Sequence, residues 1–163
     1  MPFDNDLSLT QALVADFGIM INDVADEVWM NLNEEIQYDV YDVYTPKSYD
    51  RLGVNGGLLN EFDKTHPSIT GNTITSEIGD NPDRLTLDPD NFIHGSNYWS
   101  TEDIRDLLIE IITQGKSGPL FGQGPWRAPR DFWTPFIQKL DNGFVFDLIE
   151  KAMTSRGLVW IRI

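Results

Sequence analysis

The chain of 163 residues contains no cysteine and no long hydrophobic run. Without thiols it cannot form a disulfide framework, a thiolate zinc site or a cysteine nucleophile. A membrane-spanning helix needs about 20 consecutive apolar residues, so we expect no membrane partner. Residues 1–6 are acidic and lack the basic segment that opens a signal peptide, which favours a protein that folds in a reducing cytoplasm.

Basic residues are scarce and unevenly placed. The chain carries 12 Lys and Arg against 26 Asp and Glu, a net charge of −14, and residues 1–46 include no Lys or Arg. Because nonspecific binding to nucleic acid depends on clustered cations, this charge opposes a DNA-binding surface. Three interpretations of the acidic segment stay open: a solvated helix face, a face that meets a basic face of a neighbouring subunit, and a lumen that passing DNA does not bind.

Hydrophobic periodicity predicts an α+β fold in which helices flank an antiparallel sheet, with a long N-terminal amphipathic helix and a C-terminal strand. The helix follows from apolar residues at spacings of three and four, and the first two strands are expected to form a hairpin across a Gly71-Asn72 turn, with one face buried. The expected elements are a helix at 15–41, strands at 58–62 and 73–78, helices at 100–115, 130–140 and 144–155, and a strand at 158–163.

The length of the chain favours a single domain over residues 1–163. Residues 1–14 are interpreted as a flexible arm. Residues 79–99 are rich in Pro, Asp and Asn, which predicts a long loop of a kind that often serves function or assembly.

Patterns that would indicate catalysis are weak, so we expect no catalytic residue, no cofactor and no enzyme activity. His66 and His94 are the only histidines, and neither lies at a helical metal-ligand spacing from a second ligand. No Gly-x-Ser-x-Gly elbow is present. A small metal-dependent hydrolase or nuclease that uses Asp80, Asp83 and His94 is the first alternative function.

Acidic residues of the 79–99 loop give no recognisable metal-binding pattern, so we expect no metal. Carboxylates can supply oxygen ligands to calcium, but their spacing here departs from the known calcium loop. Turn formation by Asp and Asn explains the same residues, and calcium binding by the loop stays an open question. The carboxylates concerned are Asp80, Asp83, Asp88 and Asp90.

Aromatic residues are concentrated between 126 and 146. A stacking platform for nucleic acid would interleave them with many cations, whereas here Arg127 and Arg130 are the only cations next to the first of these aromatics. Packing in the core and at an interface is therefore the expected role. The residues are Trp126, Phe132, Trp133, Phe136, Phe144 and Phe146.

One segment carries a resemblance to a known family. Tyr44-x-Pro46-x-x-Tyr49-x-Arg51, followed by Gly57-Leu58-Leu59, resembles the signature of tail-completion and minor head–tail connector (neck) proteins of long-tailed bacteriophages. Residues 128–133 are similar to the stretch that opens the last helical region of those proteins. In physical terms, Pro46 fixes a turn, the tyrosines supply apolar area, and Arg51 offers a planar set of donors to a neighbour.

The resemblance implies a structural virion protein that forms a ring, a hexamer, at the neck or tail top. Implied partners are further copies of the chain and the neighbouring connector and tail-tube proteins, with genome DNA passing without specific binding. It also implies synthesis in the cytoplasm of a host bacterium. An acidic DNA-mimic binding or inhibitor protein is the second alternative. The expected assembly residues are Tyr44, Pro46, Tyr49, Arg51, Trp126, Arg127, Arg130 and Trp133.

Overall fold

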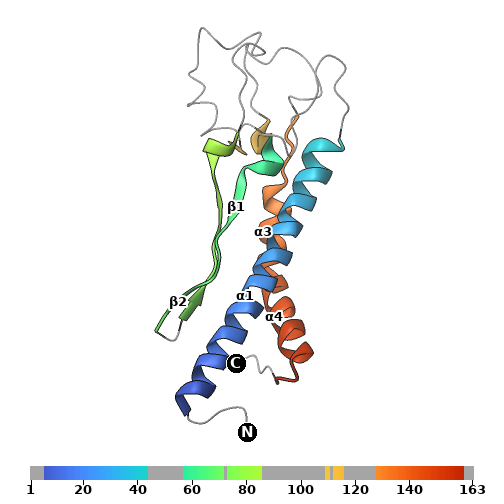
Figure 1. Cartoon of the computed structure of the whole chain (residues 1–163). Helices are drawn as coiled ribbons and strands as arrows, with labels where there is room; N and C mark the ends of the chain where they lie inside the picture. The colour runs from blue at the N-terminus through green and yellow to red at the C-terminus, as the bar shows by residue number, and fades with distance from the viewer. Residues whose placement is uncertain are drawn as a thin grey trace. The chain divides into compact units, whose positions relative to one another are not determined.

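The structure is a computed structural model, and Figure 1 shows its course. It describes residues 6–43, 57–71, 73–85, 109–110, 112–115 and 128–159. A long N-terminal helix, small antiparallel strand pairs and C-terminal helices give the mixed fold, so the predicted α+β class is confirmed.

Two compact units are interleaved along the chain, and each is described by itself. The first unit comprises Met1–Met30, Lys64–Gly79 and Lys139–Ile163, and the second comprises Asn31–Asp63 and Asp80–Gln138. Whether the chain behaves as the single domain expected from its length stays a prediction.

Helix α1 (Asp6–Ile36) begins well before the expected residue 15. The prediction of a flexible arm at 1–14 is therefore wrong from Asp6 onward, because residues 8–15 contain good helix formers and neither Pro nor Gly. Gly18 does not interrupt the helix. Of the apolar stripe that the periodicity predicted, Val24, Ala25 and Val28 are buried in the first unit and Leu32 and Ile36 in the second, while Ile21 is half-buried. Met20 and Val40 are also buried.

The helix closes with a π-helical turn, Gln37–Tyr41, so helical structure ends at the predicted residue 41. The N–H of Asp42 donates to the carbonyl of Gln37 at 2.9 Å, and the Gln37 amide donates to the Asp42 carboxylate at 2.6 Å. A π-turn widens the helix by one residue, and such turns are frequent where a side chain is re-aimed for function.

The strand expected at 58–62 is wrong for most of its length. Leu58–Asn60 form a 3-10 turn, and the strand β1 comprises Phe62–Lys64. The N–H of Asn60 donates to the carbonyl of Gly57 at 2.8 Å, and that of Glu61 donates to Leu58 at 3.2 Å. The backbone N–H groups of Asn60 and Glu61 therefore find local acceptors in a turn, and the extended strand begins only after it.

The strand expected at 73–78 is divided into β3 (Thr73–Thr75) and β4 (Ile78–Asp80). β3 pairs with β2 (Ser68–Thr70) across a two-residue turn, and β4 pairs with β1, as the green strands of Figure 1 show. The predicted turn at Gly71 is confirmed, since Gly71 has φ +60°, a conformation that favours glycine. The predicted hairpin across this turn is confirmed in β2 and β3, whereas the expected burial of one face is wrong for these two strands, which are largely exposed.

A one-residue bulge separates the two strand pairs. The N–H of Thr65 donates to the carbonyl of Glu77 at 2.8 Å, whereas Ser68 lies opposite Thr75. His66 and Pro67 therefore stand opposite Ser76 alone, the two-against-one count of a β-bulge. A proline fits here because its missing N–H is not required for the ladder. The hydroxyl of Ser76 donates to the Thr65 carbonyl at 2.8 Å and ties the bulge together.

The C-terminal helices follow the predicted boundaries closely. α3 (Trp133–Asp141) starts slightly later than the expected residue 130, and α4 (Phe144–Ser155) has the predicted bounds. The predicted break between them is confirmed at Gly143, which has φ +94°. Residues 109–110 and 112–114 are helical, in agreement with the helix expected at 100–115, and the remainder of that range lies outside the described residues.

α4 ends in a Schellman motif around Gly157, the residue expected to stop it. Gly157 has φ +71°, and its N–H donates to Thr154 while that of Leu158 donates to Met153, both at 3.0 Å. Residues 158–159 are not part of a strand, and residues 160–163 of the expected final strand lie outside the described residues.

The loop expected at 79–99 starts later than predicted. β4 extends to Asp80, and Pro82–Arg84 form a 3-10 turn. Residues 86–99 lie outside the described part of the chain. Among the described residues, no helix has both the length and the apolar character needed to cross a membrane.

Candidate assembly surfaces

Two of the eight expected assembly residues, Arg130 and Trp133, lie in the described part of the chain. The other six lie outside it: Tyr44, Pro46, Tyr49, Arg51, Trp126 and Arg127.

Trp133 belongs to an aromatic cluster in the second unit. Its ring lies nearly parallel to Phe62 of β1 at 6.0 Å between centroids, edge-on to Phe132 at 6.2 Å, and tilted to Phe136 at 5.9 Å. Phe62, Phe132 and Phe136 are buried, while Trp133 keeps 39% of its surface exposed. The cluster therefore combines core packing with an aromatic face, and exposed tryptophan is typical of protein interfaces.

The start of α3 fixes Trp133 in position. The carboxylate of Asp131 accepts a hydrogen bond from the Thr134 N–H at 2.9 Å and so caps the helix. These hydrogen bonds from the Thr134 backbone lower the pKa of Asp131. Arg130 is half-buried, and its N–H donates to the carbonyl of Ile112 at 2.9 Å. The motif at 128–133 therefore joins the residue-112 helical segment to α3.

The motif that spans residues 44–51 is flanked by a contact between described residues. The N–H of Leu58 donates to the hydroxyl of Tyr41 at 3.1 Å. Tyr41 is the last residue of the π-turn and Leu58 the first of the 3-10 turn, both in the second unit. The end of the helix and the start of the 3-10 turn, which flank segment 44–56 in the sequence, are therefore hydrogen-bonded to each other.

Glu61 is a notable residue that the sequence interpretation missed. Its side chain is 1% exposed, and its Oε2 has no hydrogen-bond partner among the described residues. Burial, followed by the nearby charge of Asp80, raises the pKa of Glu61 to about 7. The available signal was its place as the one acid between Leu58 and Phe62, in a stretch that was otherwise expected to be apolar.

The carboxylates of the hydrolase alternative do not form a site in the described residues. Asp80 and Asp83 are exposed, and His94 lies outside the described part. Nearby, Asp63 forms an ion pair with Arg84 and accepts a hydrogen bond from the Asn81 amide at 2.7 Å. Within the described residues, no group of three or more His, Asp or Glu side chains is placed to hold a metal ion. The local polar contacts thus stabilise the turn after β4.

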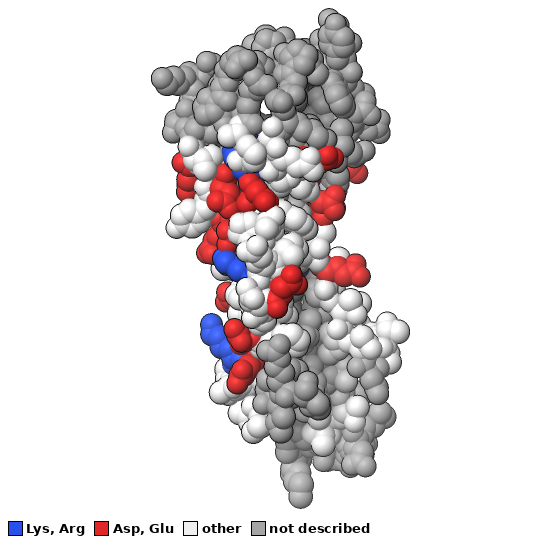
Figure 2. Space-filling model, turned by 180° about the vertical axis from the view of Figure 1, so that it is seen from behind, with Lys and Arg blue, Asp and Glu red and all other residues white. Residues whose placement is uncertain are grey.

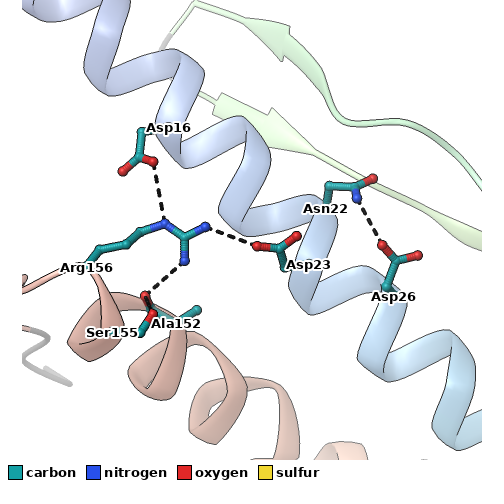
Figure 3. Close-up of polar contacts among 7 residues, drawn as sticks. All are labelled: Asp16, Asn22, Asp23, Asp26, Ala152, Ser155 and Arg156. Atoms are coloured by element: carbon teal, nitrogen blue, oxygen red, sulfur yellow. Dashed lines mark hydrogen bonds and ion pairs between the residues drawn. The ribbon is translucent and has the colours of Figure 1, made fainter.

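In the first unit, Arg156 binds the acidic face of α1 from the end of α4 (Figure 3). Its guanidinium lies 3.0 Å from the Asp23 carboxylate and 3.5 Å from that of Asp16. It also donates to the carbonyl of Ala152 at 3.1 Å, which Ser155 contacts with its hydroxyl at 2.8 Å. A cation at a helix C-terminus is favourable in itself, because it meets the unpaired carbonyl groups there.

Lys64 holds a second part of the acidic face. Its ammonium lies 2.5 Å from the Asp26 carboxylate and 2.9 Å from the Asn22 side-chain oxygen. The Asn22 amide in turn donates to Asp26 at 2.9 Å, as Figure 3 shows. Asp16, Asp23 and Asp26 are therefore paired within the chain, so the uneven charge of the sequence is partly neutralised inside the fold.

Acidic side chains still predominate over basic ones among the coloured residues of the face drawn in Figure 2. Glu27 and Glu34 are among the exposed acids of α1. The described surfaces that could meet another macromolecule are thus the aromatic cluster at Trp133 and the acidic face of α1.

The described chain is a mixed α+β protein with a partly exposed tryptophan and an acidic helix. The model of one protein family, YomN, matches residues 10–155. The chain belongs to the YomN family, which identifies it as a phage protein. Searches of curated proteins and of solved structures found no match.

Proposed function

We propose that this phage protein is a structural subunit of the virion, a tail-completion or connector protein that forms a ring at the neck or tail top. The observation that supports the proposal is the place of the motif: Tyr44-x-Pro46-x-x-Tyr49-x-Arg51 lies within the matched range 10–155. The resemblance of that motif supplies the specific role, and the family supplies the phage origin.

The contact between Tyr41 and Leu58 supports a role for the motif in contacts with neighbours. It joins Tyr41, at the end of the helix, to Leu58, a buried residue of the 3-10 turn, on either side of segment 44–56 in the sequence. Binding residues are commonly carried on segments that a rigid scaffold positions. In this proposal the segment contacts the next subunit of a hexamer, and Trp133 contacts a neighbouring connector or tail-tube protein.

The proposed role is geometric and uses no catalysis. Contacts that differ on the two sides of each subunit close a ring by repetition. The exposed acids of α1 repel a DNA backbone, which suits passage of the genome without specific binding. The pairing of Asp16, Asp23 and Asp26 within the chain makes the DNA-mimic alternative less favourable, because a mimic presents its carboxylates to a partner.

The proposal is tested in a phage that carries the gene. Purified particles are expected to contain the protein in a fixed copy number by quantitative mass spectrometry. A nonsense mutation is expected to leave heads and tails that do not join, visible by electron microscopy. A protein found only in the infected cell, with normal particles formed in its absence, would rule the proposal out.

Trp133→Ala tests the aromatic face in the same system. Loss of the exposed ring is expected to lower the yield of joined particles about tenfold or more, since interface tryptophans often contribute 2 kcal/mol or more to binding. Phe146→Ala, at an exposed aromatic position of α4, is the matched control. Equal yields from the two variants would exclude Trp133 as an interface residue.

A further inference from the structure

The ribbon formed by β2 and β3 is exposed on both faces. All three residues of β2 are exposed, and in β3 only Ile74 is half-buried. Ile69 is 50% exposed although it lies opposite Ile74. A two-stranded ribbon without a covered face is only marginally stable in water, so it gains stability from a partner that covers it.

Both edges of this ribbon are open to pairing, since within the described residues β2 and β3 each have one neighbour. In a hairpin closed by a two-residue turn, the pair beside the turn is hydrogen-bonded and the next pair is not. Thr70 and Thr73 form the first pair, so the N–H and C=O groups of Ile69 and Ile74 point outward along the edges. Such groups form a template for an added strand.

The ribbon also lacks one usual protection of an edge, charged side chains. Natural proteins place charged residues on exposed edges to prevent strand addition. Here the segment from Thr65 to Ser76 contains no Asp, Glu, Lys or Arg, and it is the longest such segment of the sequence. Pro67 lies at the bulge and precedes β2, so it does not block the edge groups of Ile69 or Ile74.

Charge indicates a second copy of this chain as the partner. With a net charge of −14, two copies repel each other over much of their surfaces. A neutral ribbon is a place where they meet without juxtaposing like charges. The strands also match: β2 reads Ser-Ile-Thr and β3 reads Thr-Ile-Thr, so each edge presents an isoleucine between two hydroxyl residues.

We propose that the ribbon joins copies of the chain by pairing the β2 edge of one copy with the β3 edge of the next. Because the two edges belong to different strands, the contact is head-to-tail and repeats around a ring. Ile69 is covered in this contact, and main-chain hydrogen bonds continue the sheet from one copy to the next. The inference rests on the proposed function for closure of the ring, and it deepens that function by naming one contact between subunits.

Sedimentation velocity over a range of protein concentrations tests the inference. The wild-type chain is expected to assemble into species larger than a dimer. Ile69→Lys and Thr75→Lys, one on each strand, are expected to move assembly to about tenfold higher concentration or more, because each places a charge at the new strand pair. Ile19→Lys makes the same change at a 58% exposed position of α1 and is expected to assemble as wild type. Circular dichroism confirms that each variant is folded.

Each other outcome overturns the inference in a recognisable way. A wild-type chain that stays monomeric at all concentrations, or ribbon variants that assemble as wild type, would exclude the ribbon contact. A dimer alone would exclude the head-to-tail form. In particles that carry Ile69→Cys, cross-linking of this position to a different protein would exclude a second copy as the occupant. If the protein is nevertheless present in purified particles, the proposed function stands while the ribbon contact fails.

Discussion

Tyr41 and Leu58 are joined by a hydrogen bond of 3.1 Å, from the main-chain N–H of Leu58 to the phenol oxygen of Tyr41. The bond connects the end of the π-turn to the start of a 3-10 turn, whose first N–H groups have no partner within the turn itself. The Tyr41 side chain therefore links the residues on the two sides of the segment that contains the motif Tyr44-x-Pro46-x-x-Tyr49-x-Arg51.

Tyr41→Phe is expected to lower the free energy of unfolding by about 1 kcal/mol, because the N–H of Leu58 loses its acceptor. Urea unfolding measures the loss, and hydrogen exchange is expected to show lower protection of the Leu58 amide. Tyr38→Phe is the matched control, since Tyr38 is 70% exposed in the same turn. Equal stability of the two variants would show that the contact contributes nothing.

The raised pKa of Glu61 is expected to make the stability of the protein depend on pH. Its pKa is raised from 4.5 to about 7, so between these values the folded state holds a proton that the unfolded chain has released. The stabilisation that this group contributes is therefore complete below about pH 4.5, and it is lost as the pH rises toward 7. The size of the decrease is about 1 to 3 kcal/mol.

Glu61→Gln keeps the shape of the neutral acid and is expected to remove this decrease, which makes the variant more stable than wild type above pH 7. Thermal unfolding from pH 5 to 8 measures the effect. Glu27→Gln, at an exposed position of α1, controls for the change in net charge. A Glu61→Gln profile parallel to wild type would mean that Glu61 ionises freely in the folded state.

The ion pairs of Arg156 are expected to make part of the stability depend on salt concentration. Arg156→Met removes the contacts to Asp16, Asp23 and the Ala152 carbonyl, and is expected to cost about 1 kcal/mol, because partly exposed ion pairs are screened by water. The difference from wild type is expected to shrink in 1 M salt. Lys151→Met, at an exposed position of α4, is the control, and an equal loss there would assign the effect to net charge alone.

Apolar residues at helical spacing, and glycines at the ends of helices and in turns, determined much of the fold. The apolar stripe from Val24 to Ile36 specified the buried face of α1, and Gly143 and Gly157 set both ends of α4 through backbone conformations that favour glycine. The two-residue turn at Gly71 could be predicted from the sequence for the same reason. These signals are local, so a single sequence contains them in full.

The strand pairing and the candidate surfaces were decided by tertiary structure. The bulge at His66 and Pro67 depends on which residues of another strand stand opposite, and the N–H of Leu58, at the start of the 3-10 turn, finds its acceptor in Tyr41. The burial of Glu61 and the pairing of Arg156 with Asp16 and Asp23 likewise join residues far apart in the chain. The sequence by itself determined helices, turns and an excess of acid; only folding decided which acids are neutralised and which strand edges stay open, because both depend on long-range contacts.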